Sequence, residues 1–339
     1  MSKKLGSQTY RLENPPVILS TASMVGPKEG EGPLGLYYDL VINDSLYGEV
    51  TWEKAESKML IDVVTAALAK VKLTPADMDL LLGGDLLDQI ITTNYAARQL
   101  AIPFLGLYGA CSTMAEGMAL GAMLVDGGFA QRVVNAASSH YDTAERQYRF
   151  PTEFGAQRPP TAQWTVTGCG SAVIGANGQG PRITHVTIGK VVDMGVKDAN
   201  DMGSAMAPAV ADTIQVHLSD TGRKPEDYDL IISGDLGIMG KTMTQQLLSE
   251  KGLDVSANFT DCGVLVYDPA QDTHAGGSGC GCSASVISSY IMHEIIGGRF
   301  NRVLFVGSGA LLSPLATQQG ESIPGIGHAV VIENISENN

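Results

Sequence analysis

Cys111 has a sequence context that suits nucleophilic or anion-binding chemistry. It follows a short apolar run and opens a segment of small residues, Tyr108-Gly-Ala-Cys-Ser-Thr-Met-Ala-Glu-Gly, that is typical of a helix start. Free N–H groups at a helix N-terminus lower the pKa of a thiol and bind an oxyanion or a carboxylate. The alternative is a buried cysteine that serves as a small apolar residue. Cys111, with the adjacent Ser112, is therefore the first candidate for a functional site.

Further candidates lie near the end of the chain. His328 stands in Gly325-Ile-Gly-His-Ala-Val-Val, a glycine turn that enters an apolar strand, where an imidazole could polarise or deprotonate a neighbour of Cys111. The alternative is a hydrogen-bonded core histidine. Cys280 and Cys282 lie in a second glycine-rich helix start that follows His274, and their alternative role is close packing of small side chains.

The elements that position these residues occur twice in the chain. Residues 75–86 read PADMDLLLGGDL and residues 225–236 read PEDYDLIISGDL, an offset of 150. Two further matches follow in the same order, residues 127–134 with 297–304 and residues 168–174 with 325–331. This period is far too long for a solenoid, so we expect one duplicated α/β unit. Cys111 then corresponds to Gly281, and the two helix starts should meet near a pseudo-twofold axis.

The order of elements in each unit predicts the fold class. Helices alternate with apolar strands at 80–84 and 132–137, and again at 230–234 and 302–307. This alternation indicates a mixed or parallel sheet that is covered on both faces. Two units back to back give a five-layered α/β/α/β/α fold with pseudo-twofold symmetry. We expect an N-terminal half over residues 1–185, which carries Cys111, and a C-terminal half over residues 186–339. Residues 138–163 have no counterpart and should be an insertion that covers a pocket or a subunit contact.

Charge and composition limit the partners of the chain. The 339 residues include 22 basic and 36 acidic side chains, for a net charge of −14. This charge disfavours nucleic acid and anionic lipid. An anionic ligand would need a bridging cation or local donors, for which Arg146 and Arg149 are candidates. The five cysteines are too irregular for a disulfide framework. Because no signal-peptide core or apolar run of roughly 18 residues is present, we expect a soluble chain in a reducing compartment.

These motifs resemble the thiolase superfamily. The features that carry the resemblance are the Gly-Ala-Cys-Ser helix start, the Gly168-Cys-Gly-Ser-Ala-Val-Ile strand, the duplicated halves and the closing Gly-Ile-Gly-His-Ala-Val-Val-Ile. It implies a homodimer that condenses or cleaves acyl thioesters through a nucleophilic cysteine, matched by Cys111, and two donors from the other half, a His with a second His or an Asn. Gly279-Cys-Gly-Cys stands where one of those donors should precede the last helix, and His274 comes several residues early. This departure argues against Claisen condensation, which needs both donors.

Three segments narrow the resemblance to a sporulation family within that superfamily: Gly6-Ser-Gln-Thr-Tyr, the Cys111 run, and His274-Ala-Gly-Gly-Ser-Gly-Cys-Gly-Cys-Ser-Ala. The resemblance implies a protein without cofactor or resident metal that binds dipicolinic acid, alone or as its calcium chelate. It further implies a subunit of the SpoVA membrane complex, peripheral at the spore inner membrane, that acts in uptake into the developing spore and release at germination. The alternative is an enzyme that condenses or transfers acyl groups from acyl-coenzyme A, with Cys111 and His328 as catalytic residues. The expected ligand site draws on Cys111, Ser112, His274, Cys280, Cys282, His328, Arg146 and Arg149.

Overall fold

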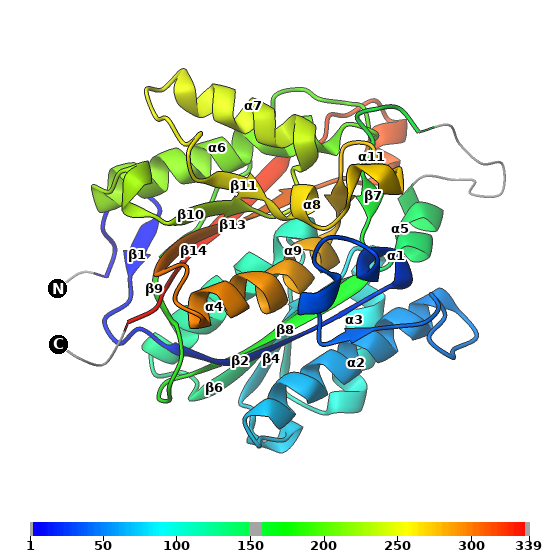
Figure 1. Cartoon of the computed structure of the whole chain (residues 1–339), viewed down its shortest axis with the longest axis vertical. Helices are drawn as coiled ribbons and strands as arrows, with labels where there is room; N and C mark the ends of the chain where they lie inside the picture. Colours follow the sequence, from blue (N-terminus) through cyan, green and yellow to red (C-terminus); the bar gives the residue numbers. More distant parts are fainter. Residues whose placement is uncertain (1–2, 149–157, 336–339) are drawn as a thin grey trace.

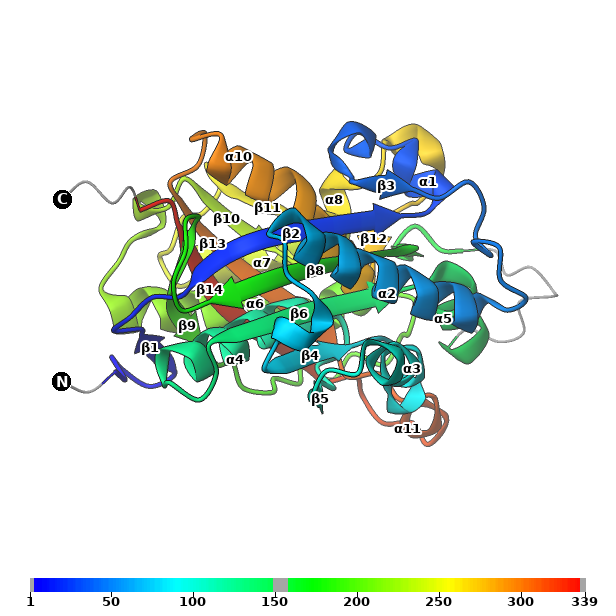
Figure 2. The same ribbon diagram turned by 90° about the horizontal axis from the view of Figure 1, so that it is seen from below.

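Ten strands of the described residues follow one hydrogen-bonded path. In the computed structural model, which describes residues 3–148 and 158–335, the order is β11-β10-β13-β14-β9-β2-β8-β6-β4-β5 (Figures 1 and 2). The path divides at its centre, because β9 and β2 share only the pairing of Val17 with Arg182. The first half contains β2 (Val17–Val25), α2 (Trp52–Lys70), β4 (Leu80–Gly84), α3 (Ile91–Leu100), β5 (Phe104–Gly106), α4 (Thr113–Asp126), β6 (Arg132–Ser139) and β8 (Gly168–Gly175).

The second half repeats this arrangement. Its elements are β9 (Arg182–Thr187), α6 (Met202–Thr221), β10 (Leu230–Ser233), α7 (Gly237–Ser249), β11 (Phe259–Asp261), α9 (Cys280–Val286), a π-helical turn (Ile287–Ile291), α10 (Met292–Ile296), β13 (Arg302–Ala310) and β14 (Gly325–Glu333). In both halves the two strands nearest the outer edge pair in parallel with their neighbours, and the two nearest the centre pair antiparallel. The expected duplication of one mixed α/β unit is confirmed.

Both halves also contain short helices and strands outside the repeated unit. They are β1 (Thr9–Arg11), α1 (Pro27–Gly30), β3 (Leu40–Val41), α5 (Tyr141–Tyr148), β7 (Trp164–Thr165), α8 (Cys262–Leu265), β12 (Gly277–Ser278) and α11 (Pro314–Gln318). The 3₁₀ turn Ala110–Ser112 precedes α4 directly. Within the described ranges, no helix is both long and apolar enough to cross a membrane.

Five layers follow from this arrangement, as Figures 1 and 2 show. Helices α2 and α3 cover the outer face of the first sheet, α6 and α7 cover that of the second, and α4 lies with α9 and α10 between the sheets. Each helical layer has its own apolar core, and the middle one is the largest, drawing on both sheets. Because burial of apolar surface is the main favourable term in folding, the middle layer joins the halves into one body. The predicted five-layered fold is therefore confirmed.

The first strands of the two halves, β2 and β9, are not predicted from the sequence. In β2 the polar residues Ser20, Thr21 and Ser23 interrupt the apolar run, so the segment lacks the continuous pattern of a buried strand. Strand β9 begins the second sheet by pairing with β14. The expected boundary between residues 185 and 186 falls within β9, and the division into two domains stays a prediction.

In both halves an aspartate carboxylate joins the amino ends of two neighbouring strands, β4 and β6 in the first half and β10 and β13 in the second. The carboxylate of Asp79 accepts from the backbone N–H groups of Gln131 and Arg132, and that of Asp229 accepts from those of Asn301 and Arg302. Each aspartate thereby connects the start of one strand to the start of its neighbour. The two aspartates are 150 positions apart, as the sequence repeat requires. The two backbone bonds that Asp79 accepts, with the larger effect from Arg132, lower the pKa of its carboxyl below the ordinary value.

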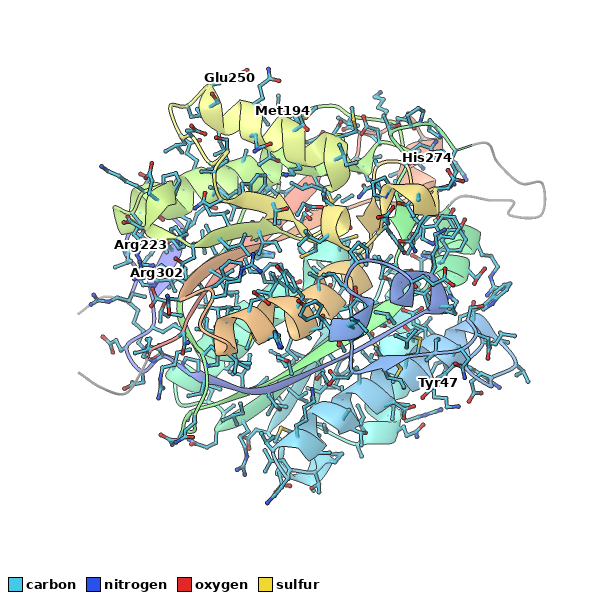
Figure 3. All side chains as sticks on the ribbon, viewed as in Figure 1. Tyr47, Met194, Arg223, Glu250, His274 and Arg302 are labelled. Carbon is cyan, nitrogen blue, oxygen red and sulfur yellow. The ribbon has the colours of Figure 1, made fainter. Side chains whose placement is uncertain are left out.

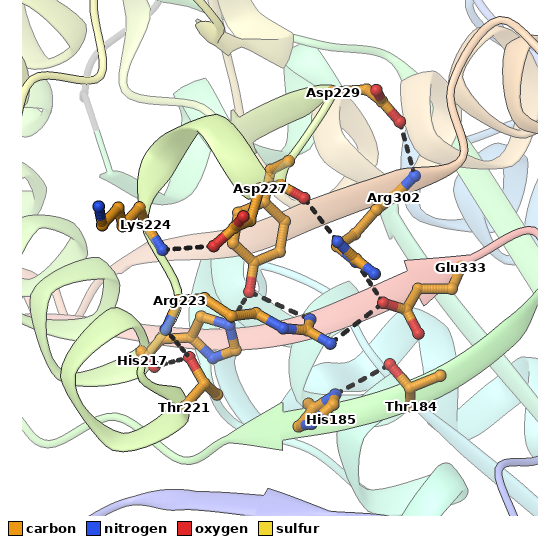
Figure 4. A network of polar contacts seen from close by, with 11 residues as sticks. Thr184, His185, His217, Thr221, Arg223, Lys224, Asp227, Asp229, Arg302 and Glu333 are labelled. Atoms are coloured by element: carbon orange, nitrogen blue, oxygen red, sulfur yellow. Dashed lines mark hydrogen bonds and ion pairs between the residues drawn. The ribbon is translucent and has the colours of Figure 1, made fainter.

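A larger polar network surrounds this tie in the second half. Arg223 and Arg302 lie near the edge from which both chain ends leave (Figure 3), and both contact the carboxylate of Glu333 (Figure 4). The fully buried ring of His217 bridges the hydroxyls of Thr187 and Tyr228 at 2.7 and 2.6 Å. Burial lowers the pKa of His217 to about 3, so this network is built on a neutral imidazole.

Glycines in the sheets let the middle helices pack closely. A Cβ atom on Gly170 in β8 would lie 2.0 Å from the carbonyl oxygen of Ala284 in α9. Substitution Gly170→Ala should therefore lower the free energy of unfolding by about 1–3 kcal/mol, because backbone cannot yield as a side chain can. Thermal unfolding followed by circular dichroism would measure this loss.

Gly121→Ala is the matched control. At Gly121 in α4 the nearest atom to a new Cβ is the tip of Ile174, at 3.3 Å, and alanine favours the helix. We expect an unchanged or raised midpoint for this variant. Equal losses in both variants would show that close backbone approach at Gly170 does not limit the packing.

Candidate functional site

A cavity of about 310 Å³ opens where strands of both halves end. It lies at the carboxyl ends of β4, β5, β7, β12 and β13, the edge at which open α/β sheets bind ligands. The residues that line it are Asp85, Leu86, Leu87, Asp88, Gln89, Ile90, Tyr108, Ala110, Cys111, Ala144, Tyr148, Thr165, Met202, Ser278, Ala310, Leu311 and Leu312. Helix α5, from the region expected to cover a pocket, contributes Ala144 and Tyr148.

Cys111 lies at the bottom of this cavity. It is 5% exposed and sits in the 3₁₀ turn between β5 and α4, so the predicted helix start is confirmed. Ala110 holds a left-handed backbone conformation with φ of +49°, which an alanine adopts only under strain. The buried hydroxyl of Ser112 donates to the carbonyl oxygen of Gly109 at 2.7 Å and so closes the turn. Ser112 supports Cys111 from behind and does not line the cavity.

The carboxylate of Asp235 is the partner of the Cys111 thiol. Asp235 follows β10 and has no exposed surface. One of its carboxylate oxygens accepts from the hydroxyl of Ser308 at 2.7 Å, and the other accepts from the backbone N–H of Gly279 at 2.7 Å. Burial raises the pKa of Asp235 to about 6, although these donors and the thiol oppose the rise. The thiol of the first half is thus held by a carboxylate of the second.

Burial, together with this pairing, reverses the effect on the thiol pKa that the sequence predicts. Burial, followed by the charge of Asp235, raises the pKa of Cys111 well above its ordinary value, whereas the helix start predicts a lowered pKa. The prediction was wrong because burial of the thiol and the charge of Asp235 both come from the packing of the two halves and outweigh the effect of the helix start. A thiol with a raised pKa is a poor nucleophile at neutral pH.

The same pattern recurs across the pseudo-twofold axis. Asp85 follows β4 as Asp235 follows β10, and it is buried beside Glu56 of α2. It accepts from the N–H and the hydroxyl of Thr93 at 2.7 and 2.6 Å. Burial, followed by the charge of Asp85, raises the pKa of Glu56 to about 8. Burial, followed by the charge of Asp85, raises the pKa of Cys280 at the start of α9, so the charge of an aspartate from the opposite half acts on each cysteine.

Cys280 and Cys282 belong to the interior rather than to the lining. The sulfur of Cys280 lies 2.8 Å from the carbonyl oxygen of Ser138, and that of Cys282 lies 3.7 Å from the carbonyl oxygen of Gly234. Both side chains are fully buried. The structure places Cys280 behind Cys111, close enough for its charge to influence the Cys111 pKa.

The two candidate histidines lie away from the lining. His328 is buried in β14 and accepts from the backbone N–H of Gly189 at 3.3 Å, and burial lowers its pKa to about 4. His274 lies near the surface (Figure 3), where its ring contacts the carbonyl oxygen of Pro159 at 2.8 Å and the carboxylate of Asp272 at 3.2 Å. Neither ring is among the residues that line the cavity. A role of either histidine in ligand binding stays a prediction.

The candidate arginines receive no support from the cavity lining. Arg146 of α5 pairs with Glu53 and lies over the ring of Trp52, outside the cavity over Cys111. Arg149 lies outside the described residues. Among the lining residues that the structure describes, none is a lysine, an arginine or a histidine.

Sequence reasoning missed Asp235 and Asp85, although a signal was present. Both stand at the end of the repeated LLLGGDL and LIISGDL segments, where the Gly-Asp pair reads as a turn. An aspartate kept directly after a buried strand in both copies could have been assigned to the site. The sequence does not show which thiol each aspartate lies near, because that depends on how the two halves pack together.

The strand order, the five layers and a cysteine at the start of a central helix define a thiolase-like protein. Two solved structures share this fold. One is 3-oxoacyl-[acyl-carrier-protein] synthase III from Aquifex aeolicus, with a TM-score of 0.60 and 12% identity over 94% of this chain and 99% of that one. The other is human mitochondrial 3-ketoacyl-CoA thiolase, with a TM-score of 0.60 and 14% identity over 96% of this chain and 99% of that one.

Sequence similarity defines the family within this fold. The model of the stage V sporulation protein AD family (SpoVAD) matches residues 6–333. Stage V sporulation protein AD of Bacillus subtilis (strain 168) is 50% identical over 331 residues, which cover 98% of each chain. The chain belongs to the stage V sporulation protein AD family, so the predicted resemblance is confirmed.

The contact between Asp235 and Cys111 can be tested through the reactivity of the thiol. In Asp235→Asn the negative charge that raises the pKa of Cys111 is removed, so the thiolate forms at lower pH. We expect the pH profile of Cys111 alkylation by iodoacetamide to move toward lower pH, with a severalfold higher rate at pH 8. Peptide mapping by mass spectrometry would measure it.

Asp88→Asn is the control for this variant. Asp88 also lines the cavity, but it is not among the groups that shift the Cys111 pKa. Its alkylation profile should match that of the wild type. An unchanged profile in a folded Asp235→Asn protein would contradict the assignment of Asp235 as the partner of the thiol.

Proposed function

We propose that the chain binds dipicolinic acid, free or as its calcium chelate, in the cavity over Cys111. The observation that carries this proposal is the pairing of the Cys111 thiol with Asp235 in a cavity whose described lining has no histidine. Condensing chemistry needs a thiolate and donors for a developing oxyanion, and a protonated thiol beside a carboxylate supplies neither. A thiolase-like frame that keeps its cavity without these groups suits binding without turnover.

The chemistry of the lining supports an aromatic dicarboxylate in a particular charge state. Leu86, Leu87 and Ile90 offer apolar walls for a planar ring, and Thr165 offers a hydroxyl group. Asp85 and Asp88 bring negative charge, and the described lining has no basic side chain to offset it. Chelated calcium would neutralise the carboxylates of the ligand and remove the repulsion. The cavity volume is at the small end of the range for ligand pockets, as a compact ligand requires.

The proposal extends to the setting of the protein. We place it as a subunit of the SpoVA complex, attached to the spore inner membrane through the membrane subunits, in uptake of dipicolinic acid into the developing spore and its release at germination. Membership in the sporulation family supports this role.

We also propose a homodimer. Strand β5 ends the strand path with one edge unpaired among the described strands, and Leu105, Tyr108 and Tyr95 are exposed beside it.

Calorimetric titration tests the ligand. Dipicolinate, with and without equimolar calcium, should bind the wild type saturably with one site per chain. Cys111→Ala should weaken binding by about fivefold, because it removes a polar contact at the bottom of the cavity.

Cys169→Ala is the matched control. Cys169 is buried in β8, where its sulfur lies 3.4 Å from the carbonyl oxygen of Met59, away from the cavity. The Cys169→Ala protein should bind dipicolinate with the same affinity as the wild type. No saturable binding by the wild type would refute the proposed function, and equal affinities in both variants would refute the site.

Acyl transfer is the competing function, since Cys111 is retained. Incubation with acyl-coenzyme A should leave no acyl group on Cys111, because the raised pKa keeps the thiol protonated. Intact-mass spectrometry after incubation at pH 7 measures this. An adduct that disappears in Cys111→Ala would establish the enzyme instead.

A further inference from the structure

The lining of the cavity over Cys111 contains strained backbone. Three of its lining residues that are not glycine have positive φ: Gln89 at +59°, Ile90 at +46° and Ala110 at +49°. Two of them are consecutive, and the second is β-branched, a residue type for which this conformation is a clear outlier. Such strain persists only where the surrounding structure holds it, and it gathers at ligand sites and switches.

Of the strained pair, Gln89 lies exposed at the mouth of the cavity and Ile90 is buried, with 2% of its surface exposed. Residues 86–90, here called the mouth turn, form a continuous stretch of the lining between β4 and α3. Asp88 and Gln89 in the mouth turn are exposed, whereas Cys111 and Ser278 are 5% and 2% exposed. A solute that reaches the thiol from this side must pass the mouth turn.

A few hydrogen bonds to neighbouring elements hold the mouth turn in place. From α3, the side-chain amide of Asn94 donates to the carbonyl oxygen of Gln89 at 2.6 Å. From α5, the side-chain oxygen of Gln147 accepts from the N–H of Asp88 at 3.0 Å, and the hydroxyl of Tyr148 donates to the carbonyl oxygen of Leu86. These bonds, together with the burial of Leu87 and Ile90, oppose the strain and hold the closed state.

The second half shows that the fold itself does not need this strain. There the connection between β10 and α7 takes only residues 234–236, and the left-handed position at the start of α7 is Gly237, with φ of +62°. Glycine adopts this conformation without cost. The first half instead places Gln89 and Ile90 in left-handed positions, in the connection that lines the cavity.

We propose that the mouth turn is a strained gate, which opens by relaxing Gln89 and Ile90 to ordinary backbone conformations and so admits solutes to Cys111. Strain lowers the cost of opening, and the bonds from Asn94, Gln147 and Tyr148 set the closed population. When labelling is slow relative to closure, the rate at which a reagent modifies Cys111 reports this opening equilibrium.

Two substitutions should move the gate in opposite directions. Gln89→Gly removes strain from the closed state only, so Cys111 should react about tenfold more slowly with N-ethylmaleimide. Asn94→Ala removes a bond that holds the closed state, so Cys111 should react about fivefold faster. Rates would be measured on the native full chain at one pH, with Cys111 identified by peptide mass spectrometry.

Ala101→Gly is the matched control. Ala101 has φ of +55° at the end of α3 but does not line the cavity. Both glycine variants should raise the thermal midpoint by about 1–3 °C, because both relieve strain. Only Gln89→Gly should change the labelling rate. Rates equal to the wild type in Gln89→Gly and Asn94→Ala, or faster labelling in Gln89→Gly, would overturn the gate.

The role of the gate for dipicolinate rests on the proposed function, and the two can fail separately. If wild-type protein binds dipicolinate, stopped-flow association should slow in Gln89→Gly and quicken in Asn94→Ala. If it binds none, the proposed function is wrong, while the labelling rates still decide whether the mouth turn controls access to Cys111.

Discussion

The buried carboxylate of Asp235 is the constraint around which the site is built. A carboxylate without solvent must find donors, because an unpaired buried charge costs several kcal/mol. The donors come from separate parts of the chain: the Cys111 thiol, the Ser308 hydroxyl and the Gly279 backbone. Satisfying one side chain therefore fixes the end of β13, the start of α9 and the turn before α4 relative to each other. These segments form the bottom of the cavity.

Duplication supplied this arrangement twice, and the two copies then diverged. In the second half, Asp261 accepts from the N–H groups of Leu236 and Gly237 and so closes the start of α7. In the first half the corresponding connection is longer and strained, and it lines a cavity. Burial, followed by a buried aspartate of the opposite half, raises the pKa of each cysteine, the aspartate acting on Cys111 by direct contact and on Cys280 through its charge. The cavity draws its lining from both halves, but the strained connection that lines it belongs to the first half alone.

The thiolase-like fold places a cysteine at a helix start, next to a cavity at the strand ends. The groups around the cysteine then decide its chemistry. Beside a carboxylate and away from solvent, the thiol of Cys111 keeps its proton. The acidic lining has a second consequence, because an anion gains nothing from it unless a cation accompanies the ligand. Fold and charge together thus support the binding of a neutral chelate that we propose, rather than covalent chemistry at Cys111.

The sequence by itself determined the duplicated fold, the helix start at Cys111 and the family. These follow from local patterns: apolar periodicity sets helices and strands, and residues 75–86 and 225–236 repeat without a gap. Only the tertiary structure decided that Cys111 faces Asp235, that the rings of His328 and His274 lie away from the lining, and that Gln89 and Ile90 are strained. Contacts between residues more than a hundred positions apart, and the pKa values they set, depend on how two sheets pack across a shared helical layer. The spacing of residues along the chain does not encode that packing.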